Sequence, residues 1–391
     1  MPGSSGESMT LLQRGEAAGG ATSGFDYLRI ALAISIMAWH TMVTLYGIDF
    51  ERPYWDSWRM LAGSGLPMFF ALSGYLVTGS LVKTESIGKF LSARAIRIYP
   101  ALAVEVLLSA LILGPLLTTL PLSAYFASEQ FWAYFHNILG IITYQLPGLF
   151  DNNPFPSVAN ISLWTIPTEL HCYIAMTAIA AFGLLRRRSL MLAVFLLAIV
   201  WETYKTLHMG PDIQFMRPQN RILIASSLGG VLAYCYRDRI PHSAAAFVVA
   251  LALQLILTRY AVTAWLAVIP TVYVVVYLGL LNPPKYTFLL RGDYSYGLYL
   301  FAFPIQQTYA MLFVHHRVWW ISFPVALGAG LLYAVFSWHV IEKPLLLRRK
   351  AIVSWCATGL RALGRAGRQV VAYAFAGASV QATAAVTSEM E

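Results

Sequence analysis

Arg29 and His40 lie in one long apolar segment, FDYLRIALAISIMAWHTMVTLYG, eleven positions apart. On an α-helix this spacing places them about 16.5 Å apart along the axis and on nearly the same face. Charged and titratable groups are costly in a membrane-spanning helix and are usually kept because they pair, transfer protons or contact a substrate. A neutral imidazole there can take the proton of an acceptor hydroxyl or itself receive a group. A lone histidine in an apolar helix is more often structural, so the shared face with Arg29 is what favours chemistry.

A second pair of cations, Arg94 and Arg97, is spaced three residues apart in ARAIRIYP and therefore shares a helix face. Arginines at the cytoplasmic end of a helix often serve only to set topology, and we weigh that interpretation equally. Two guanidinium groups close together can also clamp phosphate oxygens. With Arg29 on the same side, three cations could surround a polyphosphate.

Glu169 follows Trp164 by five residues in SLWTIPTELHCY, near the expected outer end of a helix. A carboxylate at the edge of the hydrocarbon needs a partner or a polar cavity. It could orient His40, as a carboxylate orients a catalytic base, or it could bind acceptor hydroxyls. The simpler alternative is a salt bridge to Arg217 or Arg221.

Small residues are frequent in GSGLPMFFALSGYLVTGS, the expected second helix. Such residues usually mark close helix packing in lipid, and this is the preferred interpretation for Gly79 and Ser80. Ser73 and Gly74 could also line a passage, and we therefore add them to the candidate ligand-binding residues.

The composition predicts an all-α integral membrane protein. Of 391 residues, 58% are hydrophobic and 12% are charged, which is too apolar for one soluble core. The net charge of +9 comes from short basic clusters between apolar segments, a pattern that does not indicate nucleic-acid binding. Cys172, Cys235 and Cys356 form no CxxC or ligand-like cluster, so we expect neither a disulfide framework nor a metal.

Ten apolar segments have the length of a membrane span. They lie near residues 27–47, 62–82, 98–120, 166–185, 190–207, 219–236, 243–260, 263–281, 293–313 and 319–341. Ten crossings leave both termini on one side, and a cytoplasmic N-terminus places 20 of the 27 Lys and Arg on the inside. We therefore predict a multi-pass protein of the cell inner (cytoplasmic) membrane with both termini in the cytoplasm.

The remaining segments are expected to lie outside these helices. Residues 1–24 lack the apolar run of a secretory signal and are interpreted as a disordered cytoplasmic leader. Residues 25–347 form the membrane domain, and residues 348–391 form a basic cytoplasmic tail, with a surface-lying amphipathic stretch near 352–373. Residues 121–163 are aromatic and then rich in turn formers, and an eleventh span there would invert the charge pattern of every later loop. We expect this segment to lie along the outer surface or to be re-entrant.

The chain resembles the membrane-bound acyltransferase-3 family from about Phe25 to Leu347. The matching pieces occur in order and are FDYLRIALAISIMAWH, FFALSGYLVTGSL, ARAIRIYP, SLWTIPTEL, SYGLYLFAFPI and HVIEKPLL. The resemblance implies an O-acyltransferase of the stand-alone kind that acylates exopolysaccharides and related glycans. It implies acetyl-coenzyme A, or another acyl-coenzyme A, as the donor entering from the cytoplasm and a glycan or lipid-linked sugar as the acceptor on the outer side.

This resemblance assigns expected roles to the residues above. The donor would be bound by Arg29, Arg94, Arg97, Ser73 and Gly74, and the chemistry would involve His40 and Glu169. The acceptor would contact Trp164, Tyr296 and Tyr299. We expect contact with membrane lipids, and we expect neither a bound metal nor binding of nucleic acid. The sequence leaves the oligomeric state open.

The chain departs from the family pattern in LYLFAFP, where Ala302 stands at a position that is commonly histidine in the family. If that histidine assists the reaction in relatives, it cannot do so here. Tyr296 and Tyr299 remain as polar groups on this helix, and Asp293 lies at its start. The shape of the outer loops, residues 46–59 and 121–163, would decide which sugar is accepted.

Two other functions fit buried Arg, His and Glu in a ten-helix protein. A secondary transporter of a polysaccharide precursor would be expected to show internal symmetry, and none is evident in the sequence. A non-enzymatic scaffold in polysaccharide export would use the buried charges only to hold helices together. Transfer of a labelled acyl group that depends on His40 would separate the enzyme from both.

Overall fold

The computed structural model describes residues 9–20, 22–48, 51–84, 86–208, 220–285 and 292–352, with the backbone alone for 51–59. Within these ranges the chain is helical with irregular connections, and no β-strand occurs. Residues Met1–Glu342 form one compact unit and Lys343–Glu391 a second. Arg217, Arg291 and the expected amphipathic stretch after Ile352 lie outside the described residues.

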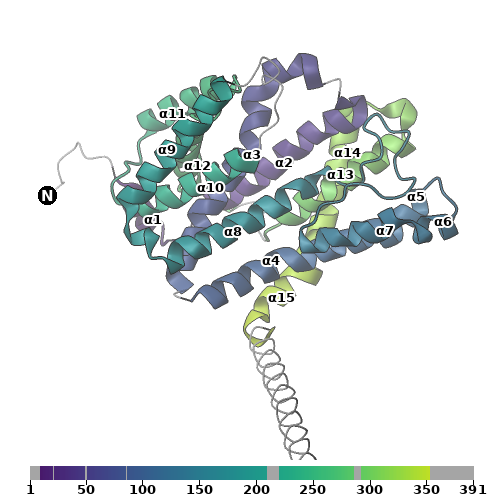
Figure 1. Ribbon diagram of the computed structural model, residues 1–391, viewed down its shortest axis with the longest axis horizontal. Coiled ribbons are helices and arrows are strands. Elements are labelled where there is room, and N and C mark those ends of the chain that lie inside the picture. The colour runs from purple at the N-terminus through teal and green to yellow at the C-terminus, as the bar shows by residue number, and fades with distance from the viewer. Residues whose placement is uncertain are drawn as a thin grey trace, which may run out of the picture. The chain divides into compact units, whose positions relative to one another are not determined.

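The prediction of an all-α fold is confirmed (Figure 1). The longer helices are α2 (Gly24–Tyr46), α3 (Glu51–Thr84), α4 (Ile87–Leu108), α8 (Ile166–Ala181), α9 (Arg188–Leu207), α10 (Asn220–Cys235), α11 (Ala244–Thr258), α12 (Val268–Gly279), α13 (Ser295–Leu312) and α14 (Trp319–Phe336). The short ones are α1 (Leu11–Ala17), α5 (Gly114–Leu117), α6 (Leu122–Ala127), α7 (Glu129–Tyr134) and α15 (Lys343–Leu347). Two π-helical stretches, η2 (Ser109–Leu113) and η9 (Ser337–Glu342), extend α4 and α14.

Each of the ten predicted apolar segments overlaps one of the longer helices, although α3 and α4 begin eleven residues earlier than their segments. Among the described residues, five helices are long and apolar enough to cross a membrane: Gly24–Tyr46, Met60–Thr84, Ile87–Leu117, Arg188–Leu207 and Trp319–Leu347. Two shorter apolar helices, α11 and α12, accompany them. The chain is therefore a helical membrane protein, and ten crossings remain a prediction.

Local sequence signals explain where several of these helices begin and end. The Ser86 and Ser243 hydroxyls accept hydrogen bonds from the backbone N–H groups of the first turns of α4 and α11. Pro167 lies in the first turn of α8, where its missing N–H costs nothing. Helix α2 ends at Gly47, whose φ of 81° is accessible to glycine with little strain.

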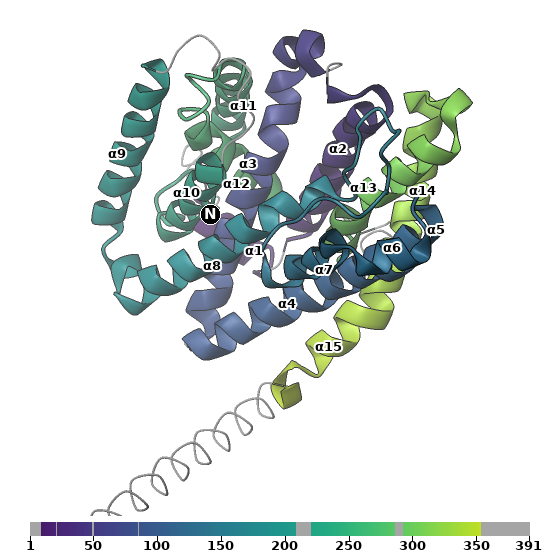
Figure 2. The same ribbon diagram turned by 45° about the vertical axis from the view of Figure 1, so that its right-hand side comes forward.

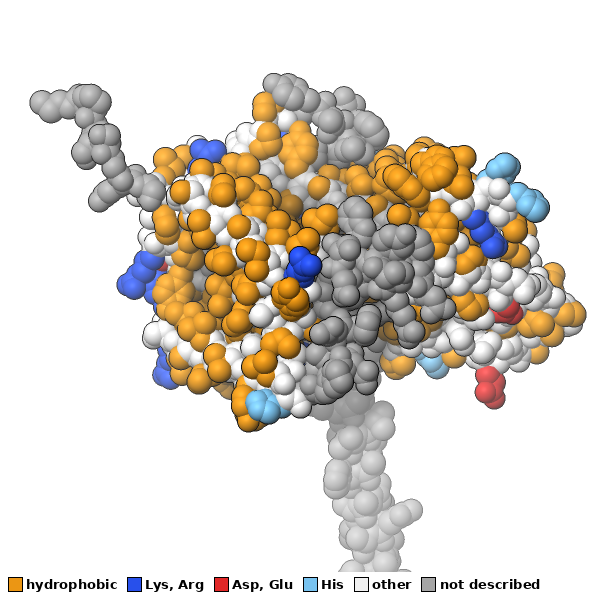
Figure 3. Space-filling model, turned by 90° about the horizontal axis from the view of Figure 1, so that it is seen from above, with side chains coloured by type: hydrophobic (Ala, Val, Ile, Leu, Met, Phe, Trp, Pro, Cys, Tyr) orange, Lys and Arg blue, Asp and Glu red, His pale blue; other side chains and the backbone are white. Residues whose placement is uncertain are grey.

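Large apolar side chains cover the outer faces of α9, α11 and α14. Leu197, Val248 and Leu332, for example, are 69%, 63% and 75% exposed. Figure 3 shows one face of the molecule, on which hydrophobic side chains predominate and charged ones are few. Exposed apolar surface of this extent is unfavourable in water and fits contact with lipid.

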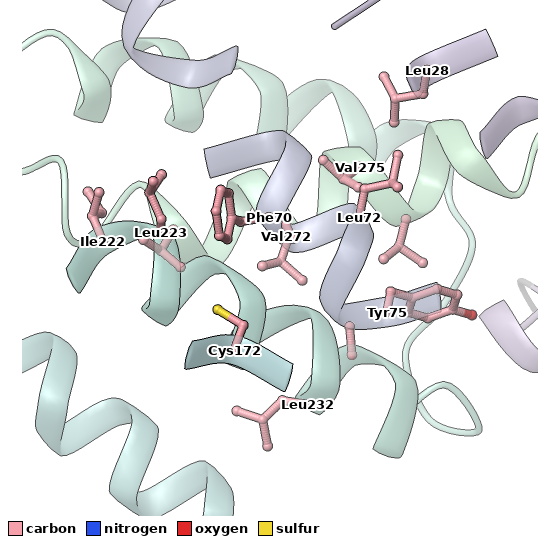
Figure 4. Packing of buried hydrophobic residues seen from close by; sticks show 14 of the residues in the cluster. Leu28, Phe70, Leu72, Tyr75, Cys172, Ile222, Leu223, Leu232, Val272 and Val275 are labelled. Carbon is pink, nitrogen blue, oxygen red and sulfur yellow. The ribbon is translucent and has the colours of Figure 1, made fainter. Parts of the chain in front are cut away.

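The interior is built around α3, which packs against α2, α10 and α12. Phe70 and Leu72 of α3 lie among side chains of α10 and α12 in the largest hydrophobic cluster (Figure 4). A Cβ atom at Gly74 would overlap the backbone carbonyl of Ser227 on α10. Gly74 thus permits close approach of two helices, which is the ordinary use of small residues in membrane proteins.

The expectation that residues 1–24 are wholly disordered is wrong for residues 10–20. Helix α1 begins at a capping box in which Thr10 and Gln13 exchange side-chain to backbone hydrogen bonds. Leu11 is only 1% exposed, and its N–H donates to the Ile240 carbonyl at 2.9 Å. The composition of the leader suggested disorder, but the buried Leu11, the cap and backbone hydrogen bonds to residues 237–242 hold this segment in place.

As predicted, residues 121–163 do not form a single membrane-crossing helix. They contain α6, α7 and two 3-10 turns, η3 (Phe135–Leu139) and η4 (Ile161–Thr165), joined by irregular chain. Figures 1 and 2 both show this irregular chain passing beside α13 before it enters α8. Its hydrogen bonds to α13 are described below.

Candidate functional site

A polar cavity of about 110 Å³ lies between α2, α3, α4, α8 and α13. Its polar lining comes from five helices and one 3-10 turn that are far apart in sequence. These residues are Arg29, Ser73, Arg94, Arg97, Thr165, Glu169, Cys172, Tyr173, Ser295, Tyr296 and Tyr299. Apolar residues, including Phe69, Phe70 and Ile98, complete the wall.

Seven of the ten residues expected from the sequence line this cavity. They are Arg29, Ser73, Arg94, Arg97, Glu169, Tyr296 and Tyr299. His40, Gly74 and Trp164 are not among its lining residues. Gly74 faces α10, as described above, and Trp164 packs partly buried against the largest hydrophobic cluster.

Asp293, just before α13, joins two of the predicted cations. Its Oδ2 atom accepts hydrogen bonds from Arg29 Nη1 at 3.0 Å and from Arg97 Nη2 at 2.7 Å. The Ser295 hydroxyl donates to the other oxygen, Oδ1, at 2.7 Å. One carboxylate therefore fixes arginines from α2 and α4 against the start of α13.

A second carboxylate, Glu342, holds the other side of Arg97. Arg97 Nη1 lies 2.7 Å from Glu342 Oε2, and the Glu342 side chain is only 1% exposed. Glu342 ends η9, and its Oε1 accepts from the Ser337 hydroxyl at 2.9 Å. Residues five apart come together in a π-helix, which explains why this pair forms here. Arg97 is thus held, partly buried, between two acids and is more than a topology signal.

Arg94 differs from its neighbours in its partners. Within the described residues no carboxylate pairs with it, and its buried Nε atom has no hydrogen-bond acceptor. Its guanidinium lies 5.9 Å from the ring centroid of Phe90 and 6.0 Å from that of Tyr173. These cation–π contacts orient the group while leaving its hydrogen-bond donors available to a ligand.

Glu169 lies in the cavity that holds the arginines. It accepts a hydrogen bond from Tyr173, one turn later on α8. That Glu169 orients His40 stays a prediction; His40 is not among the residues that line this cavity. Arg221, the alternative partner, pairs instead with Glu202 at 3.2 Å. Figure 1 shows α8 beside α4, and Glu169 in the first turn of α8 lines the cavity.

Tyr296 and Tyr299 of α13 are held by backbone carbonyls. The Tyr296 hydroxyl donates to the Ile98 carbonyl at 3.2 Å. The Tyr299 hydroxyl lies 2.8 Å from Thr165 Oγ1 and 3.1 Å from the Ser162 carbonyl oxygen. The second tyrosine therefore ties α13 to the turn that precedes α8.

His40 belongs, as predicted, to the same continuous helix as Arg29. Its ring packs edge-on against Phe303 of α13, with centroids 5.4 Å apart. Its carbonyl accepts from the Thr44 hydroxyl at 3.0 Å. The structure thus places the imidazole beside α13, farther along α2 than the arginine-lined cavity.

The sequence argument missed Tyr173, Thr165 and Glu342 as neighbours of the site. Glu342 was visible within the motif HVIEKPLL, and Tyr173 follows Glu169 by four residues, which places them on one helix face. No cluster of three or more His, Cys, Asp or Glu side chains that could hold a metal ion occurs among the described residues.

Comparisons with known proteins agree on one family. The family model for an acyltransferase domain, acyltransferase-3, matches residues 22–340. The chain is 25% identical over 343 residues to a protein named O-acetyl transferase from Shigella phage Sf6, covering 83% of this chain and 96% of that one. It is 26% identical over 376 residues to Nodulation protein 10 of Rhizobium leguminosarum bv. viciae, covering 87% and 97%. No solved structure matches. The chain belongs to the acyltransferase-3 family and is an acyltransferase.

Proposed function

We propose that the protein is an integral-membrane O-acetyltransferase of the inner membrane. It takes an acetyl group from acetyl-coenzyme A at the cytoplasmic side and transfers it to a hydroxyl of an exported or cell-surface glycan. The observation that carries the proposal is the convergence of Arg29, Arg94, Arg97 and Glu169 on one cavity within the span matched by the family model. The name of the Sf6 relative supports the acetyl group and the oxygen acceptor.

Contacts between chain segments support the predicted topology on the cytoplasmic side. If the ten helices all cross, residues 9–20 and 237–241 lie on the same side, and Leu11 donates to Ile240. Arg188 and Asp238, which begin and follow different helices on that side, form an ion pair at 2.9 Å. In the predicted topology an even number of membrane crossings separates the two members of each pair, so both members lie on the same side.

Contacts on the opposite side support the same arrangement. Trp319 N–H donates to the Tyr46 hydroxyl at 3.2 Å, and Trp265 Nε1 donates to Thr206 Oγ1 at 3.1 Å. Each pair joins helix ends or loops that the predicted topology assigns to the outer side. Charge sets which side is cytoplasmic, because 20 of 27 Lys and Arg then lie inside.

The charges of the cavity indicate which cation meets the donor. Arg29 and Arg97 are already paired with Asp293 and Glu342. Arg94 has no such partner among the described residues, so it is the cation best placed to bind a phosphate oxygen or the thioester end of the donor. The paired arginines would add a fixed positive field and hold the wall in place.

The cavity would have to widen when the donor binds. Its volume of about 110 Å³ is below the roughly 300–1,000 Å³ of a typical small-molecule site. The proposal therefore includes separation of the helices around Arg94 as a nucleotide thioester enters.

Two chemical routes are consistent with His40. In direct transfer, its neutral nitrogen takes the acceptor hydroxyl proton as that oxygen attacks the thioester carbonyl carbon; the C–S bond breaks and the proton passes to the thiolate. In the two-step route, the nitrogen attacks the carbonyl carbon, releasing the thiol, and an acceptor hydroxyl then displaces the imidazole from the acyl group. Trapping an acyl-protein in the absence of acceptor would decide between the routes.

The test of the function uses purified protein in lipid vesicles with radiolabelled acetyl-coenzyme A and total surface glycan as acceptor. We expect label in the glycan, its loss with His40→Ala, and its retention with His208→Ala, which changes an exposed histidine at the end of α9. If correctly folded wild-type protein transfers no label to the glycan, the proposal is contradicted. Movement of the glycan across the vesicle membrane without covalent labelling would favour a secondary transporter instead.

Composition analysis of surface glycans from cells with and without the protein would identify the acceptor. We expect a missing O-acetyl ester in the cells that lack it. An unchanged ester content together with reduced glycan export would favour the scaffold hypothesis.

A further inference from the structure

The irregular chain before α8 contains an unusually constrained loop, residues 150–160, which we call the clamped loop. Phe150 and Ser157 adopt positive φ values of 62° and 57°, and they are the only non-glycine residues to do so in the part of the chain that the structure describes. Phe150 is 1% exposed, so its bulky side chain is buried in this conformation. Left-handed backbone at non-glycine residues costs free energy and persists only where the surroundings enforce it.

Gln307 of α13 enforces much of this conformation. Its Nε2 donates to the carbonyls of Phe155 at 2.7 Å and Val158 at 2.8 Å, and its Oε1 accepts from Asn153 Nδ2 at 2.9 Å. The same Asn153 nitrogen also donates to the Gln307 backbone carbonyl. Gln307 is fully buried, so one amide side chain satisfies three polar groups of the loop at once.

A second anchor fixes the end of the loop. Asn160 Nδ2 donates to Glu105 Oε1 at 2.9 Å and to the Leu300 carbonyl at 2.8 Å, and all three residues are fully buried. Glu105 lies on α4 and Leu300 on α13. The clamped loop is therefore attached at both of its halves to the helices that form the cavity.

The middle of the loop faces the helix that carries His40. A Cβ atom at Gly47, at the end of α2, would lie 2.8 Å from the Pro154 carbonyl oxygen, so loop and helix are in close contact. The Phe155 ring packs on Phe303 with centroids 5.9 Å apart, and Phe303 packs on His40. A single aromatic side chain thus separates the loop from the imidazole.

The exposed part of the loop carries polar side chains beside an aromatic ring. Asp151 and Asn152 are exposed, and Phe155 is partly exposed. The Ser157 hydroxyl donates to Asp151 Oδ1 at 2.7 Å, which leaves the second carboxylate oxygen available. Planar acceptors and donors next to an apolar ring suit the hydroxyl groups and C–H faces of a saccharide.

We propose that the clamped loop is a preformed binding surface for the saccharide acceptor and that Gln307 is the residue that positions it. This inference rests on the proposed function and assigns its acceptor side to specific residues. Holding the loop in its bound conformation before the sugar arrives lowers the entropy cost of binding. Asp151, Asn152 and Phe155 would contact the sugar, while Gln307 would act only through the loop.

The test compares two buried glutamines by steady-state kinetics in vesicles, with acetyl-coenzyme A and a panel of p-nitrophenyl glycosides as acceptors. Gln307→Leu removes the three side-chain hydrogen bonds at nearly constant volume. Gln254→Leu on α11, where the amide is also buried but its Oε1 has no partner, is the matched control. We expect Gln307→Leu to raise the KM for the glycoside by about tenfold because the loop must then be ordered on binding. The KM for acetyl-coenzyme A and the rate of its hydrolysis without acceptor should stay unchanged in both variants.

A second pair of variants tests the surface without touching the buried anchors. Asp151→Ala and Asn152→Ala change exposed side chains, and each should raise the glycoside KM while leaving thermal stability unchanged. Hydrogen exchange at residues 151–158 should slow when the p-nitrophenyl glycoside is added to the wild type.

The outcomes separate this inference from the proposed function. If the wild type consumes acetyl-coenzyme A and acetylates a glycoside, but Asp151→Ala, Asn152→Ala and Gln307→Leu all leave the glycoside KM unchanged, the clamped loop is not an acceptor surface. An equal rise of both KM values in a well-folded Gln307→Leu protein would also overturn it. If the wild type neither hydrolyses nor transfers the acetyl group, the proposed function itself fails.

Discussion

Arg29 and Arg97, 68 positions apart in sequence, bind the same carboxylate oxygen, Asp293 Oδ2, at 3.0 and 2.7 Å. Side-chain exposures of 29% and 19% show that water screens neither arginine fully. Through this shared oxygen, the Asp293 side chain holds α2, α4 and the start of α13 together.

Asp293→Asn should therefore destabilise the protein. The amide keeps the size of the side chain but removes the charge that both arginines face, and we expect a loss of about 2 kcal/mol, below the ~3–5 kcal/mol of a fully buried pair because Glu342 still neutralises Arg97. Thermal unfolding in detergent micelles measures the effect. Asp238→Asn, in an exposed pair with Arg188, is the control and should change the melting temperature little. Equal melting temperatures for the wild type and Asp293→Asn would refute the structural role.

Arg94 and Arg97 should respond differently to replacement. Arg94→Ala leaves no carboxylate unpaired, so we expect a rise in the KM for acetyl-coenzyme A of about tenfold, the loss of one charge-assisted contact, with little loss of stability. Arg97→Ala leaves the buried Glu342 without its arginine, while Asp293 keeps Arg29, and should lower the melting temperature more than Arg94→Ala. If Arg94→Ala instead lowered the melting temperature more, and Arg97→Ala raised the KM for acetyl-coenzyme A more, then Arg97 rather than Arg94 would contact the donor.

Gly74→Ala tests whether this glycine packs helices or lines a passage. The added Cβ would overlap the Ser227 carbonyl, so we expect a loss of stability of at least about 1–3 kcal/mol and reduced yield of folded protein. Gly88→Ala on α4 is the matched control, because nothing lies within 4 Å of a Cβ added there. That control should be neutral or stabilising by about 0.5–1 kcal/mol. A stable Gly74→Ala protein with a raised donor KM would support the passage instead.

Ala302→His introduces the side chain that the resemblance noted in the sequence leads us to expect at this position. Ala302 is 3% exposed and packs in a cluster with Met37 and Leu298, so an imidazole there should overpack the core by about 1–3 kcal/mol. We expect lower thermal stability and no gain in the rate of acetyl transfer. A stable variant with faster transfer would indicate that this chain lacks a useful catalytic group.

Much of the fold could be predicted because the length and apolar composition of a segment are enough to indicate a membrane helix. Apolar length marked all ten helical segments, and the spacing of Arg29 and His40 correctly placed both on one helix. Order within residues 10–20 could not be predicted, since it depends on the contact of Leu11 with a loop more than 200 residues away.

The site was harder to predict because it depends on how helices are arranged. The sequence identified seven residues that line the cavity, but it gave no sign that Asp293 and Glu342 both pair with Arg97. Its suggestion that Glu169 orients His40 stays a prediction, and the structure places Glu169 in the cavity that Arg29, Arg94 and Arg97 line. The constraint on residues 150–160 was not predicted, because it includes hydrogen bonds from Gln307, which is 152 residues beyond Phe155 in the sequence.

The π-helical stretch η9 has a consequence for how this chain tolerates insertions and deletions. Wider turns at Ser337–Glu342 accommodate residues that a regular α-helix would place elsewhere around the axis. Removing a single amino acid there would restore α-helical winding and rotate the Glu342 carboxylate away from Arg97. Alignment gaps at this position in related chains would thus mark proteins in which a different acid must neutralise the same guanidinium.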